Sequence, residues 1–461
     1  MILDRAGNKL RKEKWDLNNV QDEKRAPPFL KVMVTLLTTF LNKQALNYKV
    51  LLIFGLFSSI FSAGVSGFGG GQYVILYLTA LGATPAMLGV LRSIGSAVNA
   101  IISTPMGWMM DNYNLKKLML VGMILQYIPS LVYILAGKVG FYLWWAIPSR
   151  IINTIALGLT RSSLMLLIVK SLVEEDRATG FSIRITLSRV PSLVTPMIWA
   201  FIVTFFGGLT VPGIQPLFFI SLMGRTISII WIYFKLDVST PEKPLILNTK
   251  RKSPMKRLQS FTNDLGDTIK AGKGVKRWIL ALCCDGFAFS LIMGFTTLYA
   301  VEVKDANPYI LGLMGTTFTV TNLLMAIPIG RLSDKIGRKN VIYGGLPSMF
   351  CWLFLLMYAP SPIYLIISQI FNGILRTTFP VWNIITMEIV PESYRGRFLG
   401  VTRLFTSLVS VPGSFLAGFI WTLFDPKLLF FMALAFESAA IILIKMTPVT
   451  RAQLTGMVEK A

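Results

Sequence analysis

Charged side chains lie inside several long apolar stretches of this sequence, where they could bind a charged ligand. Arg150 and Arg161 are eleven residues apart, about three helical turns, so they would share one helical face. Asn153 lies about one turn from Arg150, and Asn372 and Arg376 have the i, i+4 spacing of neighbours on a second helix. Arginine can bind two oxygens of a carboxylate or phosphate at once. These residues are the predicted substrate-binding site, and structural ion pairs are the alternative role for the arginines.

The intramembrane charges are unevenly divided along the chain. A charge inside a membrane span is costly and usually faces a cavity or a partner. The apolar stretches of the first half contain arginines and no acid: Arg92, Arg150, Arg161, Arg189 and Arg225. Arg184 lies close enough to a span end for its charge to reach the membrane surface. The other first-half arginines are therefore expected to pair across the halves, to bind backbone carbonyls, or to meet an anion.

The second half contains two acids well inside its apolar stretches, Asp285 and Glu437. Burial favours the protonated form of a carboxyl group, so either residue is a candidate for carrying a coupling proton. An ion pair with Arg225 or Arg376 is the alternative. The chain has no histidine, which removes the most common proton-relay side chain.

The elements that must position these side chains are membrane-spanning helices. The chain has 461 residues, of which 54% are hydrophobic, and a mean hydropathy of +0.62. Runs of about 20 apolar residues cross a hydrocarbon core of roughly 30 Å. The fold class is therefore an all-α polytopic membrane protein. The twelve predicted spans are 50–79, 85–109, 118–137, 141–169, 182–206, 214–235, 278–301, 309–330, 340–358, 362–387, 398–423 and 428–446.

The net charge of +23 follows from membrane topology and does not predict a nucleic-acid partner. Basic residues gather in the loops after every second span, and cytoplasmic loops are the ones that carry an excess of Lys and Arg. Both termini are basic too, so both are expected in the cytoplasm. An even number of spans is then required, which twelve satisfies.

Two internal repeats divide the chain into similar halves. The stretch GRLSDKIGRKN, Gly330–Asn340, has a weaker copy, GWMMDNYNLKK, at Gly107–Lys117, 223 residues earlier. The stretch LVEEDRATGF, Leu172–Phe181, resembles PESYRGRFLG, Pro391–Gly400. Each pair occupies the same two loops of its half, so two parallel six-helix bundles are expected. The predicted segments are a cytoplasmic N-terminal segment 1–48, bundles 49–236 and 277–447, a cytoplasmic basic linker 237–276 and a cytoplasmic tail 448–461.

These motifs resemble those of the major facilitator superfamily (MFS), whose loop motif after the second helix of each half matches Gly330–Asn340 almost fully. The resemblance covers about residues 50–446. It implies that Asp111 and Asp334 form a latch on the cytoplasmic side, Asp111 facing Arg397–Gly400 and Asp334 facing Arg177–Phe181, while the outside is open. The predicted gate residues are Gly107, Asp111, Gly330, Asp334, Gly337 and Arg338.

The predicted function is a secondary active transporter, a symporter or antiporter, of a small molecule, with access alternating between the two bundles. The substrate is either an organic anion or metabolite or a drug-like compound, and a proton or other ion is the coupling partner. A membrane sensor or signalling protein on the same scaffold is the alternative. We expect a monomer in the plasma membrane, with no enzymatic activity, cofactor, metal or nucleic-acid partner.

Overall fold

The computed structural model describes residues 40–66, 72–140, 142–173, 176–237, 274–390 and 395–447, and the elements in this part of the chain are helices. Most of the predicted linker, residues 238–273, lies outside the described residues. The first half contains α3 (Leu46–Ser66), α4 (Gln72–Ala80), α5 (Pro85–Asn112), α6 (Leu115–Leu125), α7 (Tyr127–Val139), α8 (Leu143–Ser171), α9 (Arg177–Arg189), η3 (Pro191–Leu193), α10 (Thr195–Phe205) and α11 (Val211–Lys235). The second half contains α13 (Val275–Ile292), α14 (Phe295–Glu302), α15 (Pro308–Ile336), α16 (Arg338–Tyr358), α17 (Pro362–Thr377), α18 (Phe379–Glu388), α19 (Arg395–Leu423) and α20 (Lys427–Lys445).

The described helices form a polytopic membrane bundle. Ten helical segments are long and apolar enough to cross a membrane. Two more predicted spans correspond to the consecutive pairs α3–α4 and α17–α18. The all-α prediction is confirmed, and the helices are consistent with twelve spans.

Several spans predicted as single runs are broken into two helices. The predicted span 278–301 is interrupted at Gly294, whose φ of 91° is a conformation that only glycine adopts without strain. Pro191 begins a short 3₁₀ turn in the fifth span, and Pro380 lies in the first turn of α18. Proline cannot donate a backbone hydrogen bond and interrupts a helix for that reason. These breaks fall deep in the bundle, where they redirect the chain around the interior.

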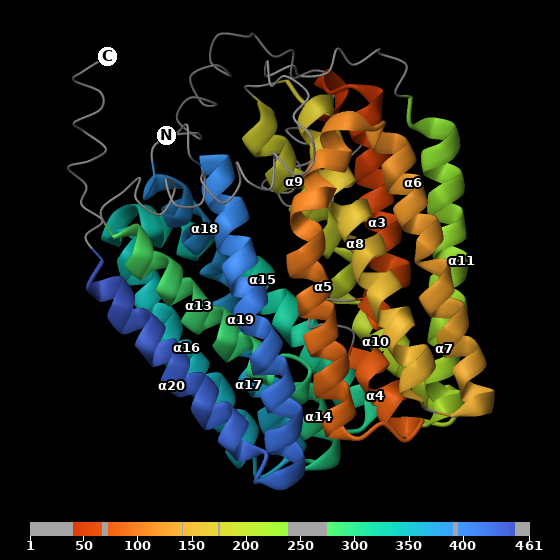
Figure 1. Ribbon diagram of the computed structural model, residues 1–461, viewed down its shortest axis with the longest axis vertical. Coiled ribbons are helices and arrows are strands. Elements are labelled where there is room, and N and C mark those ends of the chain that lie inside the picture. Colours follow the sequence, from red (N-terminus) through yellow and green to blue (C-terminus); the bar gives the residue numbers. More distant parts are fainter. Residues whose placement is uncertain are drawn as a thin grey trace, which may run out of the picture.

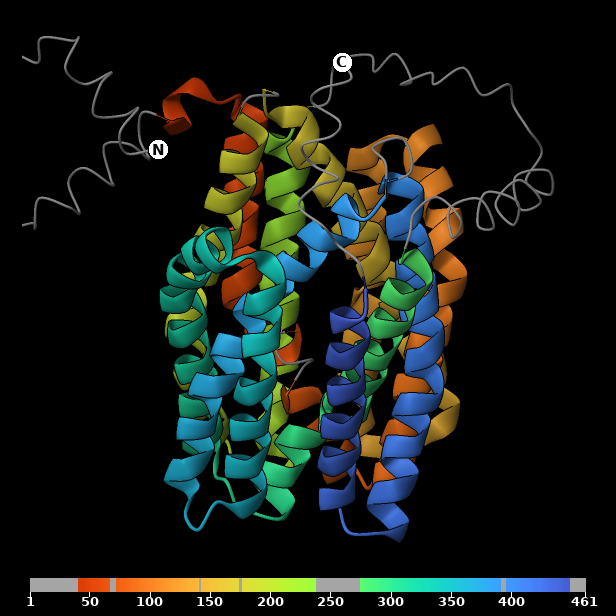
Figure 2. The same cartoon turned by 90° about the vertical axis from the view of Figure 1, so that its left-hand side faces the viewer.

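The two halves lie next to each other, and the described chain begins and ends at the same end of the molecule (Figure 1). We call this end, where α3 begins and α20 ends, the terminal face, and the other end the opposite face. Figure 2 shows the same helices from the side, with the second half nearer the viewer. The shared direction of the two termini agrees with an even number of spans.

Three hydrophobic cores show where the halves touch. One core lies toward the opposite face and combines side chains of both halves, including Trp199 and Phe218 with Phe295 and Tyr299. A second core, around Met119, belongs to the first half alone, and a third core belongs to the second half alone. Both separate cores lie toward the terminal face. The halves are therefore packed together at the opposite face and packed separately at the terminal face.

Glycines allow a close contact between the halves where α5 meets α19. A Cβ added to Gly418 would lie 2.6 Å from the Pro85 carbonyl oxygen and 3.0 Å from the Cα of Gly89. Farther along, the Ser93 hydroxyl donates to the Val411 carbonyl at 2.7 Å. Small residues let helix backbones approach in this way. We call this contact the glycine seam.

Candidate functional site

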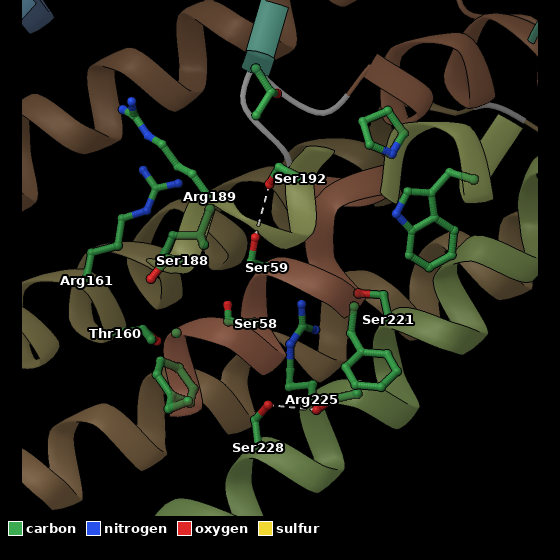
Figure 3. Close-up of a pocket in the computed structure, with 18 of the residues that line it drawn as sticks. Ser58, Ser59, Thr160, Arg161, Ser188, Arg189, Ser192, Ser221, Arg225 and Ser228 are labelled. Atoms are coloured by element: carbon green, nitrogen blue, oxygen red, sulfur yellow. Dashed lines mark hydrogen bonds between the residues drawn. The ribbon is translucent and has the colours of Figure 1, made fainter. Parts of the chain in front are cut away.

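A cavity of about 530 Å³ lies at the centre of the first half and extends to α15 of the second half. Its lining residues come from helices that are far apart in the sequence, among them α3, α8, α9, α11 and α15. Figure 3 shows polar side chains entering it from several of these helices. It has the size of a pocket for a small molecule.

Four arginines line this cavity: Arg161, Arg184, Arg189 and Arg225. Arg225 is held in place, because its Nη1 donates to the Gln126 carbonyl at 2.6 Å and to the Ser130 hydroxyl at 2.9 Å. Arg189 donates to Asn322 of the second half. Thus two of the roles expected for the first-half arginines, binding a backbone carbonyl and contact across the halves, are present.

The other two cavity arginines have donors without a partner among the described residues. Arg161 is exposed and has no hydrogen bond or ion pair to any described residue. The Nε of Arg184 is buried without an acceptor in the described part of the chain. Arg184 lies on α9, one turn before Ser188, and lines the cavity. The expectation that its charge reaches the membrane surface is therefore wrong.

Hydroxyl groups surround these arginines. The serines and threonines that line the cavity are Ser58, Ser59, Thr160, Ser188, Ser192, Ser221, Ser228 and Thr319. Ser59 and Ser192 are joined by a 3.1 Å hydrogen bond, whereas the hydroxyls of Ser188 and Ser221 are buried without a partner among the described residues. No Asp or Glu is among the lining residues. Guanidinium and hydroxyl donors without a competing carboxylate are suited to oxyanions.

The predicted substrate residues do not form a single cluster. Arg161 lines the cavity, but Arg150, Asn153, Asn372 and Arg376 do not. Asn372 donates to the Gln369 side chain at 2.8 Å. Asn153 is half-buried and has no hydrogen bond to any described residue. The sequence analysis missed Arg184 and the serines, and the signals that could have found some of them are the i, i+4 pairs Arg184–Ser188 on α9 and Ser221–Arg225 on α11.

Arg376 lies against two neighbouring aromatic rings of the second half. Its guanidinium carbon is 4.5 Å from the centroid of the Phe289 ring and 4.8 Å from that of Phe379. A guanidinium over a ring face is attracted by the ring quadrupole. The rings hold the Arg376 side chain without neutralising its charge.

Asp285 and Glu437 are neighbours in the interior of the second half. The charge of Arg376 acts on Asp285, but no ion pair within 4.0 Å joins Arg376 to either acid in the described residues. Glu437 is 3% exposed, and its Oε2 is buried without a hydrogen-bond partner there. Two adjacent carboxyl groups away from water cannot both ionise cheaply, so this pair is suited to binding one proton.

The gate motif lies at the terminal face. Asp334 is exposed and has no hydrogen bond or ion pair to any described residue, so the expected contact with Arg177–Phe181 is not made in this structure. The Asp111 side chain lies outside the described residues. Arg338 forms an ion pair with Glu388 of its own half, and Gly337 has a φ of 93° at the turn between α15 and α16. Gly107 and Gly330 have open space around them.

The beginning of α9, where Asp334 is expected to dock, is fixed by other contacts. The Gln44 side chain donates to Asp176 at 2.9 Å, and Lys43 forms an ion pair with it at 3.0 Å. These two interactions lower the pKa of Asp176. The N-terminal end of α9 is thus already anchored to the first half.

Asp334→Asn is expected to weaken the latch by about 0.3–2 kcal/mol, the range for a charge at a helix end. The population should shift toward the form with separated terminal-face cores, and transport should slow without loss of folded protein. Labelling of single cysteines at the terminal face, in a background without the native ones, measures this shift. Unchanged labelling and transport in Asp334→Asn, Asp111→Asn and the double variant would disprove the latch.

Comparison with known proteins agrees with this architecture. Residues 52–312 and 278–459 match the profile of the Major Facilitator Superfamily. The multi-drug resistance efflux pump PmrA of Streptococcus pneumoniae is 26% identical over 161 residues, which are 34% of this chain and 40% of PmrA. An uncharacterized MFS-type transporter of Pseudomonas aeruginosa is 31% identical over 33% of this chain and 38% of its own length. The matches thus span about two fifths of these relatives.

Solved structures share the fold over most of the chain. A D-xylose-proton symporter has a TM-score of 0.64 at 17% identity and covers 88% of this chain and 97% of its own. A POT family transporter in complex with 5-aminolevulinic acid has a TM-score of 0.67 at 16% identity, with 87% and 96% coverage. Because the profile covers nearly all of the membrane bundle, the chain belongs to the Major Facilitator Superfamily.

Proposed function

We propose that this protein is a secondary active transporter of a small organic anion. The observation that carries the proposal is the cavity lined by Arg161, Arg184, Arg189 and Arg225, many hydroxyls and no carboxylate. In the sequence of the first half, residues 46–235, acids occur only at Asp111, at the end of α5, and at Glu174, Glu175 and Asp176, just before α9. An anion in this cavity would relieve the cost of burying these uncompensated charges.

Alternating access is the proposed mechanism, and the excess of Lys and Arg in its loops makes the terminal face cytoplasmic. With the halves packed together at the opposite face, the structure corresponds to the form that receives or releases substrate at the cytoplasm. The opposite face is closed and the arginine-lined cavity lies inside the bundle. This arrangement supports transport by alternating access more than it supports the sensor alternative. Several relatives are described as multidrug or metabolite transporters, which supports transport of a small molecule.

Proton coupling is proposed to reside in the carboxyl pair of Asp285 and Glu437. The pair lies in the second half, away from the anion cavity, so the proton and the substrate would occupy different bundles. Protonation removes the negative charge near Arg376, and this change of charge would bias the balance between the two access states. The coupled ion would then be a proton, with no histidine involved.

Arg161→Gln tests the anion site, because Arg161 is the cavity arginine whose donors are free among the described residues. Loss of a hydrogen bond to a charged group costs about 1.5–3 kcal/mol, so affinity for a transported anion should fall about 10–150-fold. Arg161→Lys should recover only part of this loss, because lysine lacks the planar pair of donors. Binding is measured on purified protein against a panel of organic anions and neutral drug-like compounds.

Arg331→Gln is the matched control, since Arg331 is an exposed arginine at the end of α15 and its loss should leave affinity unchanged. Binding of neutral compounds alone, with no dependence on Arg161, would contradict the anion proposal. Failure of the reconstituted protein to move any member of the panel would favour the sensor alternative.

A further inference from the structure

Two arginines outside the cavity form a second cluster of positive charge. Arg92 on α5 and Arg150 on α8 are each the eighth residue of their helix, so both lie roughly 10 Å from the helix ends at the opposite face. Neither lines the cavity that contains Arg161. This second cluster is therefore separate from the proposed substrate site.

The Arg150 guanidinium reaches α5 within one helical turn of Arg92. Arg150 lies over Gly95, where an added Cβ would be 2.6 Å from its Nε and 2.7 Å from its Nη2. Gly95 is one helical turn from Arg92 on α5. Two like charges are thus brought together inside the protein, which is unfavourable unless an opposite charge joins them.

No protein group supplies that opposite charge in the described part of the chain. The Nε atoms of Arg92 and Arg150 are both buried without an acceptor, and neither arginine forms an ion pair there. The nearest acids along the adjoining chain, Asp285 and Glu302, are nine and eight residues from Gly294, about 12–13 Å in a helix. Both residues nevertheless keep part of their surface accessible.

Arg92 also reaches the second half at the break between α13 and α14. A Cβ on Gly294 would be 2.6 Å from Nη1 of Arg92, and the left-handed φ of 91° makes glycine necessary there. α14 lies beside α4 at the opposite face (Figure 1). An anion at Arg92 would therefore sit where the two halves close.

We infer that a small inorganic anion of the size of chloride binds between Arg92 and Arg150 and stabilises closure of the opposite face. The ion neutralises a pair of charges that the fold itself leaves without a counter-charge. This site is independent of the proposed function, because it involves none of the cavity arginines and a sensor on this scaffold would possess it too.

A chloride titration of the purified full chain tests the inference. Thermal unfolding is followed in chloride and in gluconate at the same ionic strength, since gluconate is too large for the site. At about ten times its dissociation constant, a bound ion should raise the Tm by roughly 1–2 °C. Nitrate should act like chloride. No difference between chloride and gluconate would overturn the inference.

Two variants locate the effect. Arg92→Gln and Arg150→Gln should each abolish the response to chloride and should unfold at a higher temperature than the unaltered protein in gluconate, because a repelling charge is removed. Arg161→Gln should keep the response. If the response persists in Arg92→Gln and disappears in Arg161→Gln, chloride binds in the cavity and the inferred site is wrong. The titration of the unaltered protein remains decisive if either glutamine variant fails to fold.

Discussion

Glu437→Gln is expected to abolish proton-driven accumulation of substrate in vesicles while exchange of substrate across the membrane continues. With one proton per substrate, a gradient of 2 pH units drives accumulation of at most about 100-fold. Glutamine keeps the size and hydrogen bonding of the side chain but cannot release a proton, so the variant should only equilibrate substrate. Accumulation with and without a pH gradient, together with counterflow, measures the two activities separately.

Glu302→Gln is the matched control for this experiment, because Glu302 is an exposed glutamate at the end of α14 and should not affect coupling. Asp285→Asn should resemble Glu437→Gln, since the two carboxyl groups act as a pair. Accumulation in Glu437→Gln equal to that of the unaltered protein would contradict the assignment.

A double variant that includes Arg376 distinguishes proton coupling from a purely structural role of the acids. In a structural ion pair, removing the acid alone leaves a buried charge unpaired and harms folding. The double variant Glu437→Gln, Arg376→Gln would then recover both folding and accumulation. If the acids carry the proton, the double variant folds but does not accumulate substrate.

Gly418→Val is expected to open the opposite face by separating the halves at the glycine seam. The added side chain would collide with the backbone of α5, which cannot move aside as a flexible side chain would. Overpacking of this kind typically costs about 1–3 kcal/mol, which is roughly a 5–150-fold change in the population of the closed form. The transport rate should fall as the closed form becomes less populated, because the opposite face must close in every cycle.

Gly344→Val provides the control on α16, away from the gate and the seam. Gly344 has no atom within 4 Å of an added Cβ, so the variant shares the change in helix propensity without the collision. Accessibility of a single cysteine placed at the opposite face should rise in Gly418→Val and stay constant in Gly344→Val. Equal accessibility in both variants would show that the seam does not hold this face closed.

Much of the fold could be predicted from the sequence, because a span is specified by a local run of apolar residues. The helix breaks were harder to predict, since Gly294 becomes distinctive only through its left-handed backbone. Within the candidate site, the absence of acids in the first half correctly indicated arginines that bind carbonyls or contact the other half, as Arg225 and Arg189 do. Which arginine faces the cavity depends on helix rotation and packing, so Arg184 was missed.

The acid-free interior of the first half also exposes the protein to the membrane potential. The arginines within its predicted spans are Arg92, Arg150, Arg161, Arg184, Arg189 and Arg225. A potential of 100 mV acts on each elementary charge with about 2.3 kcal/mol across the full field. A rocking motion that moves these charges through only a tenth of that field would change the balance of access states by about tenfold. A bound anion cancels part of this charge, so the empty carrier should respond to voltage more strongly than the loaded one.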